Sequence, residues 1–422
     1  MKEILFEWNP WWVEKYEFEG VKRDIFEHIK QWINRKEIIS LIGVRRSGKT
    51  TLFYEIINYL LHEKKISNEN IFFIKADDDR INPENLIDKT IEEYKKEFNP
   101  KSKIFLFIDE IQEISNWEKT LKRIYDLNKN IKIFISGSNA SLLKEETSSF
   151  LAGRFAYFEI FPFSFKEYLS AKKIEWKDKK LILNKYLIKK NLEIYAQEGS
   201  FPEVTLEKKS KLKKELIRFY FDSIFYRDII KRKKIRNPVK MEKLIKYFFQ
   251  NISNQINFSK AGKIVDLTTD SVGEYAKFLE EAYLMFIINF FGYSYKKQII
   301  NPKKIYSVDV GIRNIVGFKF SEDIGRLCEN IIAIELKRRN KEIYYWQNSK
   351  KQEVDFVIKN NDNSLIGINV SYTDEINERE IRSLLDFKKQ FKQCKELIIL
   401  TENLEKKEKG INFIPLWMWL LN

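Results

Sequence analysis

The chain has 422 residues, of which 44% are hydrophobic and 32% are charged, and its formal net charge at pH 7 is +15. This length is too great for one hydrophobic core and predicts two to four domains, and the apolar content excludes a generally disordered chain. Two cysteines and two histidines leave too few ligands for a disulfide framework or a set of structural zinc sites. We expect a cytoplasmic protein with no membrane partner, because the sequence shows no signal peptide and no apolar run of roughly 20 residues.

The positive charge is concentrated in one part of the chain. Residues 166–246 contain 24 Lys/Arg and 11 Asp/Glu. A basic segment of this kind favours a polyanionic partner, with nucleic acid first, and it is equally typical of a solvated helical surface. The charge alone does not distinguish a polyanionic partner from a solvated helical surface, and double-stranded DNA is the polyanion to test.

The first 36 residues combine a tryptophan cluster with a predicted helix. Trp8, Trp11 and Trp12 lie around Pro10, and residues 21–33 have the spacing of an amphipathic helix. We expect the tryptophans to pack this arm onto the following domain, and a contact with an adenine base is the alternative.

Residues 43–50 read Gly-Val-Arg-Arg-Ser-Gly-Lys-Thr and match the phosphate-binding P-loop. An apolar strand is predicted before the loop at 37–42 and an amphipathic helix after it at 51–61. Glycines let such a loop approach phosphates closely, and the first N–H groups of the helix face the β-phosphate. Lys49 is predicted to contact the β- and γ-phosphates of ATP, and Thr50 to hold Mg²⁺. The predicted nucleotide-binding residues are Gly43, Val44, Arg45, Arg46, Ser47, Gly48, Lys49, Thr50 and Thr51.

Residues 104–108 form a run of five apolar residues, which follows Lys103 and ends in two acids, the Walker B pattern. A strand buried on both faces must be apolar throughout, and open α/β sheets bind ligands at the carboxyl ends of their strands. Asp109 is predicted to hold Mg²⁺. Glu110 is predicted to be the general base for the attacking water.

A further apolar strand at 131–135 ends in Ser136, Gly137, Ser138 and Asn139. This stretch resembles the AAA+ ATPases, in which a polar residue here contacts the γ-phosphate or the lytic water; Ser138 and Asn139 are both candidates. Arg154 precedes the next strand, where AAA+ ATPases place an arginine finger that acts on a neighbouring subunit's nucleotide. That role requires a homo-oligomer, and a surface arginine with a local ion pair is the alternative.

Nearly the whole sequence resembles the prokaryotic, largely archaeal, AAA+ ATPases that carry a C-terminal restriction-endonuclease-like domain of unknown function. The resemblance is carried by residues 43–52, 107–112, 136–139, 151–154 and 161–168, with further signatures at 198–203 and 226–232. It implies an α/β fold class. Four parts are predicted, with junctions near prolines: a P-loop AAA+ core (1–165), a helical lid (166–237), a winged-helix-like module (238–299) and an α/β restriction-endonuclease-like domain (300–422).

The winged-helix-like module is predicted from three short helices, at 241–252, 259–265 and 268–280, and an apolar strand at 282–291. In a helix-turn-helix, the third helix would enter the major groove of DNA. Asp270 and Glu274 on that helix repel phosphate. DNA recognition and protein–protein packing therefore stay equally open for this module.

The C-terminal domain is predicted to contain strands at 342–346, 353–358, 365–370 and 396–401, with helices around 325–339 and 378–391. Active nucleases of the class it resembles need an Asp ligand, then an acid and a lysine one residue apart, around a catalytic metal. Glu329 and Asp355 match the first positions, whereas Asn369 and Ser371 stand where the acid and the lysine are needed. Lys359 is a candidate for a displaced lysine. We expect a degenerate nuclease fold that binds rather than cuts.

The sequence thus predicts an ATPase that binds ATP with Mg²⁺ and hydrolyses it to ADP and phosphate. The predicted catalytic residues are Lys49, Glu110, Ser138, Asn139 and Arg154, and Thr50 and Asp109 are the predicted metal ligands. Hydrolysis is expected to be coupled to DNA or to a protein partner through the winged-helix-like module and the C-terminal domain. The alternatives are a slow nucleotide-dependent protein-interaction switch and an ATP-gated nuclease.

Overall fold

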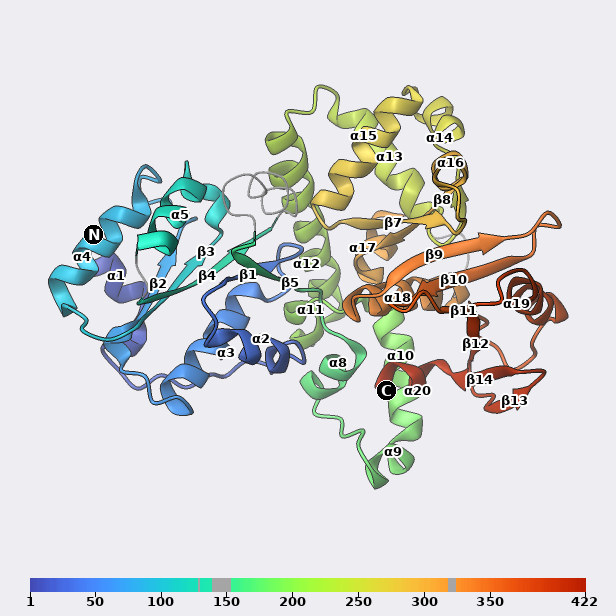
Figure 1. Cartoon of the computed structure of the whole chain (residues 1–422), viewed down its shortest axis with the longest axis horizontal. Helices are drawn as coiled ribbons and strands as arrows, with labels where there is room; N and C mark the ends of the chain where they lie inside the picture. Colours follow the sequence, from blue (N-terminus) through green and yellow to red (C-terminus); the bar gives the residue numbers. More distant parts are fainter. Residues whose placement is uncertain (128–129, 139–152, 318–323) are drawn as a thin grey trace. The chain divides into compact units, whose positions relative to one another are not determined.

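The structure is a computed structural model, and it describes residues 1–127, 130–138, 153–317 and 324–422. The chain divides into two compact units, Met1–Ile160 and Phe161–Asn422, each built on its own β-sheet (Figure 1). The two units are described separately below.

A parallel sheet forms the centre of the first unit, with the strand order β2-β3-β4-β1-β5. The predicted strands at 37–42 and 103–108 are confirmed, and every residue of β1 and β3 is buried, as their continuous apolar runs indicate. The P-loop strand lies inside the sheet, between β4 and β5. The strands are β1 (Ile38–Ile42), β2 (Ile71–Lys75), β3 (Ile104–Asp109), β4 (Ile131–Gly137) and β5 (Phe155–Glu159).

Helices cover both faces of this sheet. The chain passes from β1 to the far edge through α3 (Lys49–His62), then returns toward β1 through α4 (Leu86–Phe98) and α5 (Trp117–Leu127). Because such crossovers are right-handed, α3 lies on one face and α4 and α5 lie on the other (Figure 1). The helix predicted at 21–33 is shorter in the structure, where α2 (Phe26–Ile33) begins at Phe26. Before this helix, the N–H of Arg23 donates to Glu55 Oε2 (3.2 Å).

The N-terminal arm covers edge strand β2, as the packing interpretation of the tryptophans predicts. The arm consists of α1 (Lys2–Trp8) and a 3₁₀ turn (Pro10–Trp12). The indole N–H groups of Trp11 and Trp12 both donate to the carbonyl of Ile71 (3.0 and 2.9 Å). Asn9 accepts from the N–H of Phe73 (2.6 Å) and donates to its carbonyl (3.0 Å). The arm therefore satisfies edge groups of β2 that would otherwise be open to another strand.

The second unit begins with a helical layer that corresponds to the predicted lid. Its helices α10 and α12 pack against α17 (Val310–Val316). The buried Asp309 also accepts hydrogen bonds from the N–H and hydroxyl of Ser200 (2.7 and 3.0 Å). These helices are thus joined to later segments of the same unit, and their lid role stays a prediction. The layer contains α8 (Phe165–Ala171), α9 (Lys179–Leu183), α10 (Lys185–Glu198), α11 (Pro202–Leu206), α12 (Ser210–Ser223) and a π-helical turn (Ile224–Lys231).

The three short helices of the predicted winged-helix-like module are confirmed, and a short two-stranded hairpin follows them. They are α13 (Pro238–Gln250), α14 (Phe258–Val265) and α15 (Thr269–Glu281). The hairpin is formed by β7 (Met285–Phe290) and β8 (Lys303–Ser307), which pair antiparallel around α16 (Tyr295–Ile300). The short β6 (Gln255–Ile256) pairs with the other side of β8.

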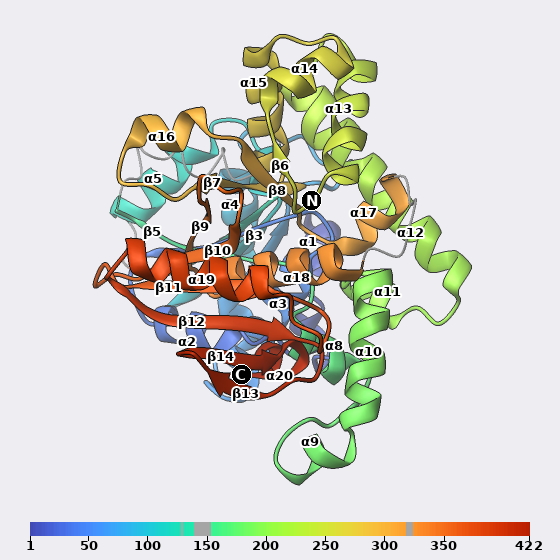
Figure 2. The same ribbon diagram turned by 90° about the vertical axis from the view of Figure 1, so that its right-hand side faces the viewer.

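The sheet of the second unit continues across the junction predicted near residue 300. Strand β7 pairs in parallel with β9, and the order is β13-β14-β12-β11-β10-β9-β7-β8-β6. Helix α18 packs on β8, β9 and β11, and α19 packs on β10, β11 and β12 (Figure 2). The elements are α18 (Ile324–Arg338), β9 (Glu342–Gln347), β10 (Glu353–Lys359), β11 (Leu365–Val370), α19 (Glu378–Gln390), β12 (Cys394–Thr401), β13 (Lys406–Glu408), β14 (Ile411–Pro415) and α20 (Leu416–Leu421).

Replacement of Asn9 by alanine is expected to loosen the N-terminal arm. The change leaves the N–H and carbonyl of Phe73 without their partner, at a cost of about 2–4 kcal/mol in the free energy of unfolding. Urea unfolding followed by tryptophan fluorescence measures this cost. Asn34→Ala, at an exposed asparagine after α2, is the matched control and should change stability by less than about 1 kcal/mol. An equal loss in both variants would contradict the role of Asn9.

Candidate nucleotide-binding site

The P-loop makes a tight turn between β1 and α3. Gly43 has a φ of 149°, and a Cβ at this position would lie 2.2 Å from the carbonyl oxygen of Ile160. Gly48, which immediately precedes α3, has a φ of 95°. Both glycines therefore allow a backbone path that residues with a side chain disfavour. This path leaves the first N–H groups of α3 at the mouth of the loop, where they suit an anion.

Lys49 and Thr50 open α3 and turn toward the loop and toward β3. The ammonium group of Lys49 donates to the carbonyl oxygens of Gly43 and Val44, both at 3.0 Å. The hydroxyl of Thr50 donates to Asp109 Oδ2 at 2.7 Å. A lysine charge over the loop and two hard oxygen ligands beside it fit a nucleotide phosphate with Mg²⁺.

Asp109 is a buried carboxylate, 3% exposed, at the carboxyl end of β3. Its Oδ1 accepts a hydrogen bond from the hydroxyl of Ser136, at the end of β4. Burial, followed by the charge of Glu110, raises the pKa of Asp109 to about 6, and the hydrogen bonds from Ser136 and Thr50 act in the opposite direction. A cation beside this carboxylate would favour its ionised form.

Glu110 follows in a left-handed backbone conformation (φ 51°), and its N–H donates to the hydroxyl of Ser136 (3.0 Å). The side-chain amide of Gln112 donates to Glu110 Oε2 and to the hydroxyl of Ser138 (3.3 Å). Gln112 thus links the predicted base to one of the two predicted γ-phosphate contacts. The other candidate, Asn139, lies outside the described residues.

Arg154 and the P-loop of its own chain lie at opposite ends of the strands of the sheet. Its carbonyl accepts from the N–H of Ile38, at the amino end of β1, whereas the P-loop follows the carboxyl end of that strand. The two ends of β1 are about 15 Å apart, given the rise per residue of a strand. The guanidinium is 3.3 Å from Asp126 Oδ1 and 5.6 Å from the ring centre of Tyr125. The structure therefore does not bring Arg154 to its own P-loop, and a role in a neighbouring subunit stays a prediction.

Sequence reasoning assigned no role to three residues that build the site. Gln112 lies two positions after Glu110, and Ser136 ends the next apolar strand; a polar side chain at each of these positions is the available sequence signal. Arg23 has no such signal: it is buried before α2, and its guanidinium donates to the carbonyl of Ser47 in the P-loop (2.8 Å).

In the second unit, the structure brings Glu329 and Asp355 together around a lysine that the sequence did not single out. Lys304 on β8 places its ammonium 2.9 Å from Glu329 Oε1 and 3.3 Å from Asp355 Oδ1, and it also contacts Glu353. Burial raises the pKa of Glu329 to about 8, against the opposing effect of Lys304. Among the described residues, no group of three or more His, Cys, Asp or Glu side chains is arranged to hold a metal ion.

The other predicted nuclease-site residues lie beside this cluster or away from it. Asn369 accepts a hydrogen bond from the N–H of Asp355 (3.1 Å). Ser371 donates its N–H to the carbonyl of Leu400 (2.8 Å) and lies beyond the end of β11. Lys359 is four positions further along β10 than Asp355 and pairs with Glu342 (3.5 Å). Lys304, and not Lys359, is therefore the lysine at the carboxylates.

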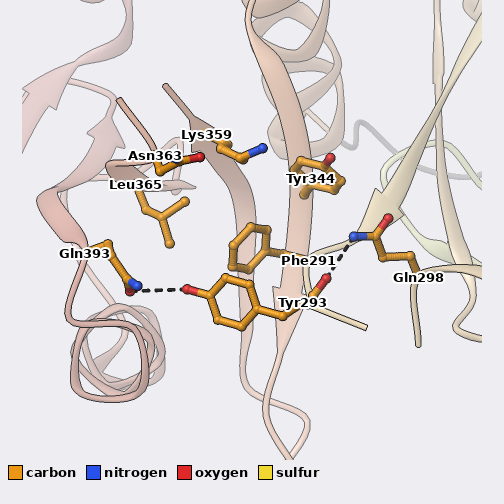
Figure 3. Close-up of a pocket in the computed structure, with 9 residues that line it drawn as sticks. Phe291, Tyr293, Gln298, Tyr344, Lys359, Asn363, Leu365 and Gln393 are labelled. Carbon is orange, nitrogen blue, oxygen red and sulfur yellow. Dashed lines mark hydrogen bonds between the residues drawn. The ribbon is translucent and has the colours of Figure 1, made fainter. Parts of the chain in front are cut away.

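A hollow of about 460 Å³ lies elsewhere in the second unit (Figure 3). Phe291 lies between Tyr293 and Tyr344, with ring centres 5.9 and 5.5 Å away. The hydroxyl of Tyr293 donates to Gln393 (3.2 Å). The lining is aromatic and amide-rich with one lysine, which suits a partner side chain or another planar group. The lining residues are Phe291, Gly292, Tyr293, Gln298, Tyr344, Lys359, Asn363, Leu365 and Gln393.

The P-loop and the acids at the carboxyl end of β3 define a nucleoside triphosphate-binding domain of the P-loop class. Residues 35–169 match the family described as AAA domain, which makes the first unit a P-loop AAA domain. Residues 189–322 and 324–419 match two families described as domains of unknown function, DUF8612 and DUF4143. In the described residues, no helix has both the length and the apolar character needed to cross a bilayer.

The chain belongs to the same protein family as the uncharacterized protein MJ1544 of Methanocaldococcus jannaschii. The two are 33% identical, and the match covers 97% of this chain and 96% of the relative. An uncharacterized protein of Haemophilus influenzae is 29% identical, over 93% of this chain and 97% of that protein. Cdc6p from Pyrobaculum aerophilum is a solved structure that covers 76% of this chain and 97% of its own, with 13% identity and a TM-score of 0.28, which is too low to carry an argument.

Replacement of Ser136 by alanine is expected to shift the pH dependence of Mg²⁺-dependent ADP binding. The hydroxyl of Ser136 lowers the pKa of Asp109, so its loss should raise that pKa. Asp109 then becomes protonated, and loses its value as a metal ligand, at a higher pH. Binding of a fluorescent ADP analogue, measured from about pH 5 to 8, should therefore weaken at a higher pH in the variant than in the wild type.

Ser138→Ala is the matched control, because the Ser138 hydroxyl is hydrogen-bonded to Gln112. We expect its pH profile to follow that of the wild type. A Ser136→Ala profile that also follows the wild type would show that Ser136 does not tune Asp109.

Proposed function

We propose that the chain is a Mg²⁺-dependent AAA ATPase that hydrolyses ATP to ADP and phosphate. The observation that carries the proposal is the hydrogen bond between Thr50 and Asp109, 2.7 Å long, which joins the start of the P-loop helix to the end of β3. It supports a metal position beside the phosphates, because both oxygens are hard ligands of the kind Mg²⁺ prefers. Bound Mg²⁺ would supply charge neutralisation at the β- and γ-phosphate oxygens.

The roles of the remaining side chains follow from this arrangement. The N–H groups of residues 43–51 and the ammonium of Lys49 hold the phosphates and stabilise the charge that builds up on them. The Glu110 carboxylate, held by Gln112, accepts a proton from water as the water oxygen attacks the γ-phosphorus, and ADP departs with the bridging oxygen. Ser138 or Asn139 contacts the γ-phosphate.

Two variants separate nucleotide binding from chemistry. Lys49→Ala should lower kcat/KM for ATP by about 100-fold or more, because it removes the charge from the phosphates. Glu110→Gln should bind ATP as the wild type does and lower kcat by about 100-fold or more, because an amide cannot accept the proton. Steady-state phosphate release and ATP-analogue binding measure the two effects. Normal turnover in Glu110→Gln would show that another group is the base.

We further propose that the active form is a homo-oligomer in which Arg154 reaches the nucleotide of a neighbour. The location of Arg154 at the amino ends of the strands supports this proposal, because its own P-loop follows the opposite, carboxyl end of β1. Arg154→Ala should then lower turnover by about 1,000-fold. A mixture of Arg154→Ala and Lys49→Ala chains should recover part of the activity, because each supplies what the other lacks.

The experiment with mixed Arg154→Ala and Lys49→Ala chains has a matched control variant. Arg123→Ala removes an arginine of the same unit that pairs with Asp88 on the surface, and it should keep normal turnover. If Arg154 only pairs with Asp126, mixing the two inactive chains will restore nothing.

Coupling to DNA or to a protein partner is proposed for the second unit, with double-stranded DNA contacted by the winged-helix-like module (238–299). The excess of lysine and arginine over residues 166–246 supports a polyanionic partner. The restriction-endonuclease-like domain is proposed to bind rather than cut, and the buried free cysteines Cys328 and Cys394 support a reducing, cytoplasmic setting. ATP hydrolysis measured with and without double-stranded DNA, over a series of protein concentrations, tests this part. Turnover that rises with both supports a DNA-linked oligomer.

The aromatic hollow around Phe291 favours the second candidate, a nucleotide-dependent interaction switch with a protein partner. A switch would show slow turnover, indifferent to DNA and to protein concentration. Partner capture in that case should be weakened by Tyr293→Ala, which removes an exposed ring from the hollow. Tyr295→Ala, at an equally exposed tyrosine outside the hollow, is the control.

A further inference from the structure

The second unit contains a lysine that is buried among carboxylates contributed by two other elements. The side chain of Lys304 is 1% exposed, and its ammonium contacts Glu329 on α18 and both Glu353 and Asp355 on β10. An ammonium group has three N–H donors and no acceptor. Lys304 therefore has one N–H donor for each of the three carboxylates that it contacts.

Each of these carboxylates also has a second donor that carries no charge. The hydroxyl of Tyr306 donates to Glu329 (2.7 Å), and the side-chain amide of Gln255 donates to Glu353 (2.6 Å). The N–H of Val370 donates to Asp355 Oδ2 (2.9 Å). A metal ion at this place would have to displace the ammonium and then compete with hydrogen bonds already made.

Asn369, at the position where a nuclease needs an acidic ligand, is engaged elsewhere. Its amide nitrogen donates to Glu380 Oε2 (2.6 Å) and to the hydroxyl of Ser383 (3.0 Å), both on α19. Its oxygen accepts from the N–H of Asp355. The amide thus ties β11 to α19 and to β10 and has no oxygen directed at a shared cation.

We propose that the Lys304 ammonium takes the place of a divalent cation in this cluster, so that the site holds no metal ion. The cluster then acts as an internal ion pair that fastens α18 and β10 to β8. The inference extends the proposal that this domain binds rather than cuts, and it supplies a physical reason: the position for a catalytic metal is filled by the chain itself. It makes no use of ATP hydrolysis, so its failure and that of the ATPase proposal can be told apart.

The first test uses the full chain without nucleotide and Mn²⁺ as the probe. The melting temperature is measured with and without Mn²⁺ for the wild type and for Asp355→Asn. Any shift caused by Mn²⁺ should be the same in both proteins, because no ion binds at Asp355. A stabilising shift in the wild type that disappears in Asp355→Asn would overturn the proposal.

The second test creates the metal site by removing the ammonium. Lys304→Ala leaves three carboxylates facing the vacated space, and it should melt at a lower temperature than the wild type. Saturating Mn²⁺ should then raise its melting temperature by about 5 °C, because binding to the folded state alone stabilises it. The double variant Lys304→Ala/Asp355→Asn should lose this gain.

Lys303→Ala is the matched control, since the neighbouring lysine donates to the carbonyl of Gln298 and to no carboxylate that the structure describes. Mn²⁺ should not raise its melting temperature beyond the wild-type shift. A folded Lys304→Ala protein that gains nothing from Mn²⁺ would overturn the proposal. If Lys304→Ala does not fold, the comparison of the wild type with Asp355→Asn decides alone.

Discussion

The first unit depends on one buried carboxylate. Removing the Asp109 charge from water is costly unless polar groups replace the solvent, and here hydroxyls of Thr50 and Ser136 do so. These two residues come from the P-loop helix and from β4, so burial of the carboxylate fixes three segments at one edge of the sheet. The hydrogen bonds that make the acid tolerable in the core also set the positions of the proposed metal ligands Thr50 and Asp109.

The elements of the fold follow closely from the sequence, and their pairing does not. Continuous apolar runs such as 104–108 predict buried parallel strands, and the helical spacing after the P-loop predicts α3, because both signals depend on local side-chain burial. The pairing of β7 with β9 joins residues 289 and 344, and no local pattern reports a contact at that separation. The shortened α2 is a similar case, because the N–H of Arg23 donates to Glu55, which lies 32 positions away in the sequence.

The candidate sites show the same limit. Lys49, Thr50, Asp109 and Glu110 are predictable because spacing within each motif places the first two at the start of the helix after β1 and the last two at the carboxyl end of β3. Arg23 and Lys304 are recognisable only once distant segments are brought together. Lys304 is the clearest example: a lysine in a lysine-rich sequence carries no signal, and its burial among carboxylates is a property of the folded sheet.

The continuous sheet of the second unit has a consequence for how such proteins diversify. Two families of unknown function divide the sequence between residues 322 and 324, yet β7 and β8 on one side share a sheet with β9 on the other. A gene rearrangement at that point would separate β7 from its partner β9 and leave an unpaired strand edge on each side. In this chain the two family matches therefore describe parts of one continuous sheet, although they are recognised separately.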